Sequence, residues 1–263
     1  MAAYSDYLQV PTDLPVPAFV SAPRQAIDAP GVTLWSDMLD QQRAPGPITT
    51  GPDDLCVMPY TSGTTGHPKG CMHTHRSAMS TLVGGVQWFA RTQDSTYLTV
   101  LPLFHVFAAY PILMSMIASG AHVVFPTPAG YRGEGVFDNL WKLVERYKVT
   151  YLITVPTALA ALMQRPINAD ISSLKNAFSG SAPLPVELYN RFKKETGIEI
   201  VEGYGLTECT CLVSVNPPGG TKKIGSVGLP FPHTHVRILQ KTPDGFRDCG
   251  VDEVGEICVA NPG

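Results

Sequence analysis

The chain has 263 residues, 44% of them hydrophobic, and a formal net charge of −3. This length and apolar content are enough to bury a core, and the charge excludes the broad basic surface on which nucleic-acid binding depends. The six cysteines lack the paired spacing of a zinc site, and no charged and then apolar leader opens the sequence. We expect a protein of a reducing, cytoplasmic setting, with no transmembrane segment and no nucleic-acid partner.

The first 52 residues are rich in proline and show little hydrophobic periodicity. They predict an irregular lead-in with one short helix near residues 35–41. A short strand over residues 55–60 and a helix over residues 75–90 follow, and a loop rich in glycine and hydroxyl side chains separates the two.

The segment from Ser95 to Tyr131 contains no Asp, Glu, Lys or Arg, which raises the question of a membrane span. Prolines, glycine and histidines interrupt the segment, and its parts have the lengths of separate elements. It therefore predicts a buried βαβ unit instead, with a strand over 96–101, a helix over 104–118 and a strand over 121–125.

Helices and strands continue to alternate up to about residue 219. We expect helices over 137–147, 157–163 and 186–196, and strands over 150–155, 174–178 and 199–203. This alternation predicts an α/β fold in which a mainly parallel sheet is flanked by helices on both faces. Beyond Gly219, VGLPFP, HVRILQ and GEICVA are short strands separated by turns. They predict the start of a separate β-barrel-like element over 220–263, after an α/β unit over 53–219.

The stretch YTSGTTGHPKG, residues 60–70, is the loop between the predicted strand and helix. In that place unpaired backbone N–H groups and the helix dipole favour an anion, so we expect a phosphate cradle. Glycines permit close backbone approach, hydroxyls donate hydrogen bonds, and Lys69 adds a positive charge. The spacing differs from that of a P-loop, so a P-loop NTPase is not implied.

YTSGTTGHPKG resembles the phosphate-binding signature of the adenylate-forming enzymes, which include acyl-CoA synthetases, aryl-CoA ligases and the adenylation domains of peptide synthetases. Two further stretches are similar to that family in the same order, namely SGSAPL at residues 179–184 and GYGLTE at residues 203–208. The resemblance covers about residues 53–263.

In that family a carboxylate attacks the α-phosphorus of ATP, which gives acyl-AMP and pyrophosphate, and coenzyme A then receives the acyl group. The resemblance implies that ATP, Mg²⁺ and coenzyme A take part here. It implies that the β- and γ-phosphates are held by Thr61, Ser62, Gly63, Thr64, Thr65, Gly66 and Lys69. It places Gly180, Ser181, Ala182 and Pro183 along the adenine, and Tyr204, between Gly203 and Gly205, on its face. Thr207 would hydrogen-bond the α-phosphate and Glu208 would hold Mg²⁺.

His105, in LPLFHVF, resembles the histidine that lies beside the reacting carboxylate in acyl- and aryl-CoA synthetases. An amino-acid-activating domain would carry an acidic residue shortly after Phe104, yet no acid occurs before Glu134. A buried ammonium without a counter-charge is costly, so we expect a fatty or aryl acid as the substrate. The candidate catalytic residues are His105, Thr207, Glu208 and Lys69. Candidate walls of the acyl pocket are Phe107, Tyr110, Pro111, Gly203 and Cys209.

The sequence also departs from the family pattern. After the segment that GEICV at residues 255–259 resembles, the family has an aspartate for the ribose and a small C-terminal domain with a catalytic lysine. The sequence up to Gly263 includes neither, and its start does not resemble the family's first sheet. It resembles the middle of a synthetase, truncated at both ends. We expect weak nucleotide binding with little turnover, and self-association through the face that the missing sheet would cover.

Two other interpretations stay open. One is a non-catalytic nucleotide-binding fragment. The other is the amino-acid adenylation domain of a peptide synthetase.

Overall fold

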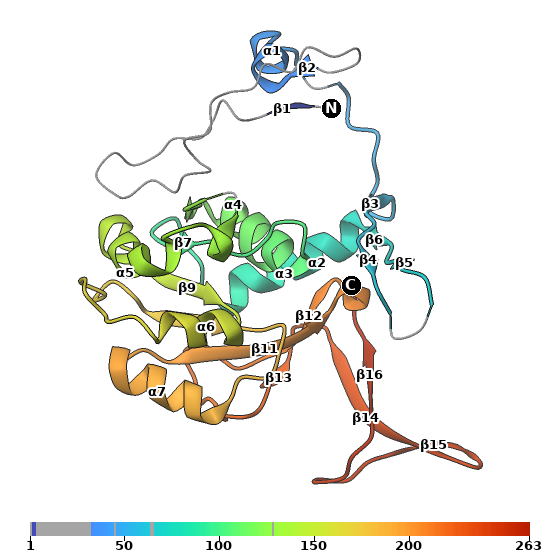
Figure 1. The fold of residues 1–263 in the computed structure, drawn as a ribbon. Coiled ribbons are helices and arrows are strands. Elements are labelled where there is room, and N and C mark those ends of the chain that lie inside the picture. Colours follow the sequence, from blue (N-terminus) through green and yellow to red (C-terminus); the bar gives the residue numbers. More distant parts are fainter. Residues whose placement is uncertain (1, 4–32, 45, 64–65, 128) are drawn as a thin grey trace.

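A seven-stranded sheet forms the centre of the molecule, in the order β13-β12-β11-β10-β9-β7-β8. The computed structural model describes residues 2–3, 33–44, 46–63, 66–127 and 129–263. The five strands from β8 to β11 run parallel, whereas β12 and β13 are antiparallel additions at one edge (Figure 1). The strands are β7 (Thr96–Leu98), β8 (His122–Val124), β9 (Tyr151–Thr154), β10 (Asn176–Ser179), β11 (Ile200–Leu206), β12 (Cys211–Val215) and β13 (Leu229–Pro230). The predicted α/β class is confirmed.

Helices cover both faces of this sheet. One face carries α5 (Val136–Tyr147), α6 (Pro156–Leu162) and α7 (Val186–Thr196), and the other carries α2 (His75–Trp88) with a second helical segment. That segment is the helix expected over 104–118, and it consists of α3 (Val106–Ala108), a π-helical stretch η2 (Ala109–Met114) and α4 (Ser115–Ser119). Pro111 lies inside η2 and has no N–H to donate, which accounts for the wider turn there.

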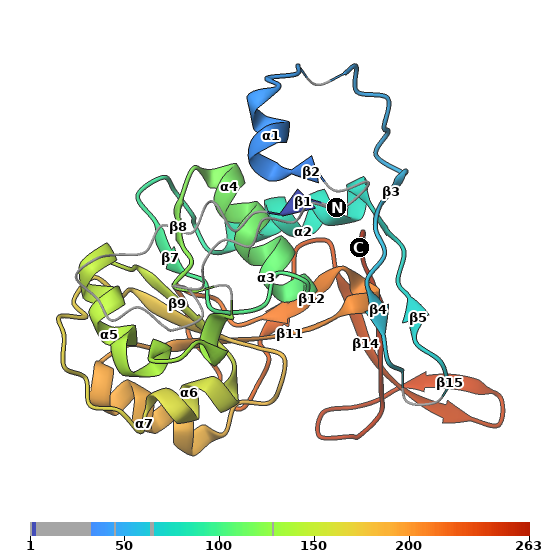
Figure 2. The same cartoon turned by 45° about the horizontal axis from the view of Figure 1, so that its top comes forward.

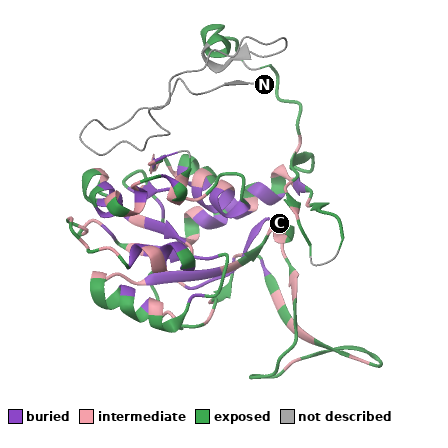
Figure 3. Ribbon diagram, in the orientation of Figure 1, coloured by how far each residue is buried: buried purple, intermediate pink, exposed green. Residues whose placement is uncertain are grey.

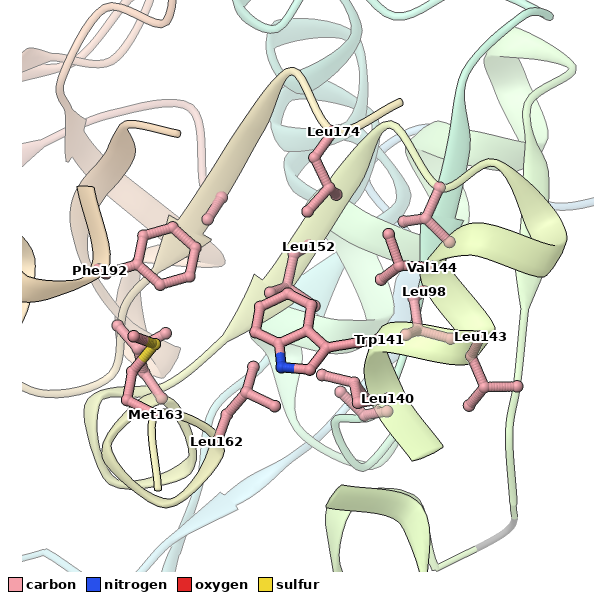
Figure 4. Close-up of a cluster of buried hydrophobic side chains, with 14 of the residues drawn as sticks. Leu98, Leu140, Trp141, Leu143, Val144, Leu152, Leu162, Met163, Leu174 and Phe192 are labelled. Atoms are coloured by element: carbon pink, nitrogen blue, oxygen red, sulfur yellow. The ribbon is translucent and has the colours of Figure 1, made fainter. Parts of the chain in front are cut away.

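Consecutive residues of each central strand feed two different cores, because side chains of a strand alternate between the faces of the sheet. On β10, Ala177 packs with α5–α7 while Phe178 packs with α2–α4, and Ile200 and Val201 of β11 divide in the same way. Trp141 of α5 is only 2% exposed, and its indole lies among leucines of the sheet and of α5 and α6 (Figure 4). Figure 3 shows β12 buried along its length, whereas β11 is buried in its first half and becomes exposed towards its end.

The smaller elements lie outside the seven-stranded sheet. The predicted helix near residue 35 is confirmed as α1 (Trp35–Asp40), while residues 4–32 of the lead-in lie outside the described residues. The remaining elements are β1 (Ala2–Ala3), β2 (Thr33–Leu34), β3 (Leu55–Val57), β4 (Tyr60–Thr61), β5 (Lys69–Gly70), β6 (His73–Thr74), η3 (Gly130–Arg132) and η4 (Thr207–Cys209).

The C-terminal β-rich element is smaller than expected. The strand inferred from VGLPFP is β13, and it pairs with β12 in the main sheet rather than with the strands that follow it. The separate element is a three-stranded antiparallel sheet of β14 (His235–Thr242), β15 (Gly245–Asp248) and β16 (Glu256–Ala260), in the order β15-β14-β16. The division into domains at residue 220 stays a prediction.

No helix among the described residues is long and apolar enough to cross a membrane. The uncharged segment that raised the question folds as β7, the three-part helix and β8, in the order that the sequence indicates.

Gly205 lies where the backbone of β12 leaves no room for a side chain on β11. The pairing register shifts between Tyr204 and Gly205, and a Cβ atom at Gly205 would lie 1.6 Å from the carbonyl oxygen of Cys211. We expect Gly205→Ala to lower the free energy of unfolding by about 2 kcal/mol or more, because the backbone of β12 must move.

Gly219→Ala is the matched control, since nothing lies within 4 Å of a Cβ built at Gly219. Urea unfolding of both variants measures the difference. Equal stabilities for the two variants would contradict the packing that the structure gives to Gly205.

Candidate functional site

An open cleft lies at the carboxyl ends of β10 and β11, the position at which parallel α/β sheets bind ligands. It contains about 510 Å³ of empty space. Its lining comes from the start of α3, the turn after β10, the second half of β11 and the start of β12. The lining residues are His105, Val106, Phe107, Phe178, Gly180, Ser181, Gly203, Tyr204, Gly205, Leu206, Thr207, Cys211 and Leu212.

The cleft joins candidates from three separate stretches of the sequence. Its lining includes His105, Gly180, Ser181, Gly203, Tyr204, Gly205 and Thr207. Phe178, Cys211 and Leu212 also line it and were missed. Phe178 is the last apolar residue before SGSAPL, a usable signal, whereas Cys211 and Leu212 belong to β12, a strand that the sequence did not indicate. Of the candidate walls, Phe107 and Gly203 line the cleft, but the Tyr110 hydroxyl bonds to His73.

The glycine-rich loop lies between β3 and α2, as expected, and its two ends pair as a β-hairpin. β4 and β5 pair antiparallel, with Tyr60 opposite Gly70 and Thr61 opposite Lys69. The N–H groups at the start of α2 all have partners. Thr74 and Ser77 exchange hydrogen bonds in a capping box, and the N–H groups of His75 and Arg76 donate to the carbonyl oxygens of Asp54 and Pro52. The expectation of unpaired N–H groups was therefore wrong, whereas the phosphate cradle stays a prediction. Thr64 and Thr65 lie outside the described residues, and Gly63 and Gly66 have φ angles of 60° and 94°.

The hairpin meets the GYGLTE segment. Thr61 Oγ1 donates to Glu208 Oε1 at 3.1 Å, a contact between residues 147 positions apart. Lys69 lies opposite Thr61 in the ladder, is exposed, and forms no ion pair with any residue that the structure describes. Figures 1 and 2 both place the hairpin on the side of the molecule away from α5–α7. The hairpin that carries Lys69 is therefore in contact with Glu208, which lies just after the end of β11.

The turn between β11 and β12 has an unusual backbone. Thr210 and Cys211 have φ angles of 50° and 96°, in a region that non-glycine residues enter at a cost of about 1–2 kcal/mol each. Three side chains from distant elements bond the carbonyl oxygens of this turn. They are His73 Nε2 on Thr207 O at 2.7 Å, Thr81 Oγ1 on Thr210 O at 2.8 Å, and Asn261 Nδ2 on Cys209 O at 3.2 Å.

The segment after β10 is tied to β11 by a buried carboxyl group. The Leu184 N–H donates to Glu202 Oε1 at 2.9 Å, and the Glu202 side chain lies in the interior. This bond holds the stretch that contains Gly180 and Ser181 against the cleft, and Ser181 has a φ of 68°. Ala182 and Pro183 are exposed and do not belong to the cleft lining.

Comparison with known proteins decides the family. A family model described as AMP-binding enzyme matches residues 13–263. The chain belongs to the AMP-binding enzyme family. This agrees with the adenylate-forming resemblance of its three sequence stretches.

Relatives of this AMP-binding chain include two curated ligases and many solved structures. It is 36% identical over 211 residues to a marinolic acid–CoA ligase of Pseudoalteromonas sp. (strain SANK 73390), and this match covers 77% of this chain and 32% of the relative. It is 33% identical over 215 residues to a long-chain-fatty-acid–CoA ligase of Bacillus subtilis (strain 168), with coverages of 80% and 37%. ATP-bound MatB from Rhodopseudomonas palustris superimposes with a TM-score of 0.74 at 29% identity, over 83% of this chain and 42% of that one. The chain thus spans about a third of the length of these curated relatives.

His105 stands at the edge of the cleft as a neutral imidazole. Its Nδ1 accepts from the Phe107 N–H at 3.2 Å, which caps the start of α3. Desolvation lowers the pKa of His105, so the ring carries no charge at neutral pH, and its Nε2–H is left to donate.

The arrangement fits magnesium bound through a nucleotide. Among the described residues no group of three or more His, Cys, Asp or Glu side chains could hold a metal ion. Mg²⁺ commonly takes one or two protein carboxylates and completes its shell with phosphate oxygens and water. Glu208 is exposed beside the hairpin and offers one such carboxylate.

Glu202 makes stability depend on pH in a defined direction. Desolvation raises the pKa of Glu202, and the weaker opposing influence is the hydrogen bond from the Leu184 N–H. A carboxyl group whose pKa is raised in the folded state lowers the stability of the fold when it is ionised. This loss of stability disappears as the pH falls through the raised pKa toward the ordinary pKa of a glutamate side chain. We expect wild type to gain unfolding free energy relative to Glu202→Gln when the pH changes from 7.5 to 4.5.

Urea unfolding of both proteins at the two pH values measures the change, and the glutamine variant cancels the other titrating groups. A difference in unfolding free energy that is independent of pH would show that Glu202 does not titrate in this window.

Proposed function

We propose that the chain forms the ATP- and acid-binding part of an AMP-forming acid–CoA ligase. In that reaction a carboxylate oxygen attacks the α-phosphorus of ATP, pyrophosphate leaves, and the thiol of coenzyme A later displaces AMP from the acyl-AMP. The observation that carries the proposal is the contact of Thr61 with Glu208 beside the cleft, because it brings the hairpin and the GYGLTE segment to one place. The marinolic acid–CoA and long-chain-fatty-acid–CoA ligases support the class of reaction.

The nucleotide would lie across the carboxyl end of β11. Lys69 and the hydroxyls of the hairpin would neutralise the β- and γ-phosphates as charge moves onto the leaving pyrophosphate. Tyr204, half-buried in the cleft wall, would stack on the adenine, and Thr207 would hydrogen-bond the α-phosphate. Mg²⁺, held by Glu208, would supply a fixed positive charge on the same phosphates.

The acid would enter the apolar part of the cleft. Phe107, Phe178 and Leu212 line this part, and no Asp or Glu is among the lining residues that the structure describes. A substrate ammonium would therefore lack a counter-charge, which favours fatty or aryl acids over amino acids. His105 would donate its Nε2–H to the reacting carboxylate and keep it aimed at the α-phosphorus.

The cellular setting is also part of the proposal. All six cysteines are free thiols, which is typical of a reducing, cytoplasmic compartment. Self-association through an uncovered face stays a prediction.

Binding of magnesium–ATP to the 263-residue chain tests the nucleotide site directly. We expect saturable binding by calorimetry, and we expect Lys69→Ala to weaken it about tenfold, because one charge-assisted contact to phosphate is lost. Lys194→Ala is the matched control, since Lys194 is an exposed lysine on α7, on the far face of the sheet. No binding by wild type, or equal losses in both variants, would refute the assignment.

Exchange of labelled pyrophosphate into ATP separates the substrate classes. Exchange stimulated by fatty or aryl acids supports the proposed ligase. Stimulation by amino acids alone would instead identify an adenylation domain of the peptide-synthetase type.

A further inference from the structure

His73 is a buried histidine that connects three separate segments. It lies on β6, directly after the hairpin, and is 2% exposed. Its Nε2 bonds the carbonyl oxygen of Thr207 at 2.7 Å, and its Nδ1 bonds the hydroxyl of Tyr110, on η2, at 3.0 Å. Both ring nitrogens are therefore occupied by groups that lie far away in the sequence.

The partners determine the tautomer of His73. A carbonyl oxygen can only accept, so Nε2 must carry the proton that is donated to Thr207. In the neutral ring Nδ1 is then an acceptor, and the Tyr110 hydroxyl donates to it. Burial raises the pKa of Tyr110 to about 12, so this hydroxyl keeps its proton at neutral pH.

The bond to Thr207 acts on the carbonyl of the peptide group that joins Thr207 to Glu208. Thr81 and Asn261 bond carbonyl oxygens further along the turn, at Thr210 and Cys209, so His73 alone of the three acts on its first residue. The Thr210 N–H bonds the same oxygen at 3.1 Å, so the turn is also closed locally. The two left-handed residues that follow make its geometry costly, and the bond from His73 adds support from a distant element.

We propose that His73 is a positioning residue for the nucleotide site, with Tyr110 as the partner that supports its ring at Nδ1. The segment that contains Lys69 continues directly to His73. One short stretch of chain therefore carries the Lys69 side chain and also donates a hydrogen bond to the carbonyl oxygen of Thr207. This sets the distance between the two halves of the phosphate site. The inference rests on the proposed nucleotide-binding function.

Two substitutions at residue 73 distinguish the effect of losing the hydrogen-bond donor to Thr207 from the effect of losing the imidazole ring. The amide nitrogen of His73→Gln can take the place of Nε2 and donate to Thr207, whereas the shorter amide of His73→Asn corresponds to Nδ1 and falls short. We expect His73→Asn to weaken magnesium–ATP binding about tenfold, the equivalent of one lost hydrogen bond. We expect His73→Gln to stay within about twofold of wild type.

Tyr110→Phe tests the support of the ring. Without the phenol Nδ1 is buried and has no partner, so the ring is held less firmly against Thr207, and we expect binding to weaken about threefold. The same change in the His73→Gln background should have no effect, because glutamine has no nitrogen at the position of Nδ1. This cycle remains decisive if His73→Asn does not fold.

Three readouts distinguish positioning from a structural role. Calorimetry with magnesium–ATP gives the affinities, circular dichroism at the same temperature verifies that each variant is folded, and nitrogen-15 NMR of the imidazoles gives the tautomer of His73, assigned by its loss in His73→Gln. An Nε2–H ring with the affinities above supports the inference. An Nδ1–H or doubly protonated ring, or equal affinities for wild type and His73→Asn, overturns it while the proposed function stands. No binding by wild type overturns both.

Discussion

The tight return of the chain from β11 into β12 is the constraint on which the site depends. It adds an antiparallel strand to an otherwise parallel sheet edge, and it does so through two residues in left-handed conformations. Three carbonyl oxygens of this return accept hydrogen bonds from side chains that are distant in sequence, and the Thr210 N–H closes the turn on the Thr207 carbonyl oxygen. The geometry of the candidate nucleotide site therefore depends on α2, on β6 and on the residue after β16 as well as on the turn itself.

The two hydrophobic cores lie on opposite faces of the sheet, and only one of them contributes residues to the cleft. The core beneath α5–α7 contains Trp141 and a large set of leucines, and the cleft takes none of its lining from that core. The core beneath α2–α4 is more aromatic and supplies Phe107, Phe178 and Leu212 to the cleft. Because side chains alternate between the faces along β10 and β11, the same strands contribute residues to both cores.

Local patterns made much of the fold predictable, and contacts between distant residues limited the rest. The expected bounds of α7 agree with Val186–Thr196, because an amphipathic helix is encoded within its own residues. β12 was missed because all its residues are buried, so it lacks alternation, and its entry through Thr210 and Cys211 has no glycine to mark it. The hairpin pairing at residues 60–70 was not predicted, since pairing between such short strands leaves no periodic signal. His73 was not singled out, because both its partners are remote in the sequence.

Asn261 gives the small C-terminal sheet a mechanical connection to the centre of the molecule. It follows β16 directly, and its amide holds the carbonyl oxygen of Cys209. The three-stranded sheet cannot rotate about its junction without either dragging the β11–β12 return along with it or breaking that bond. This sheet supplies none of the described residues that line the cleft, yet through Asn261 it is hydrogen-bonded to the residue that follows Glu208.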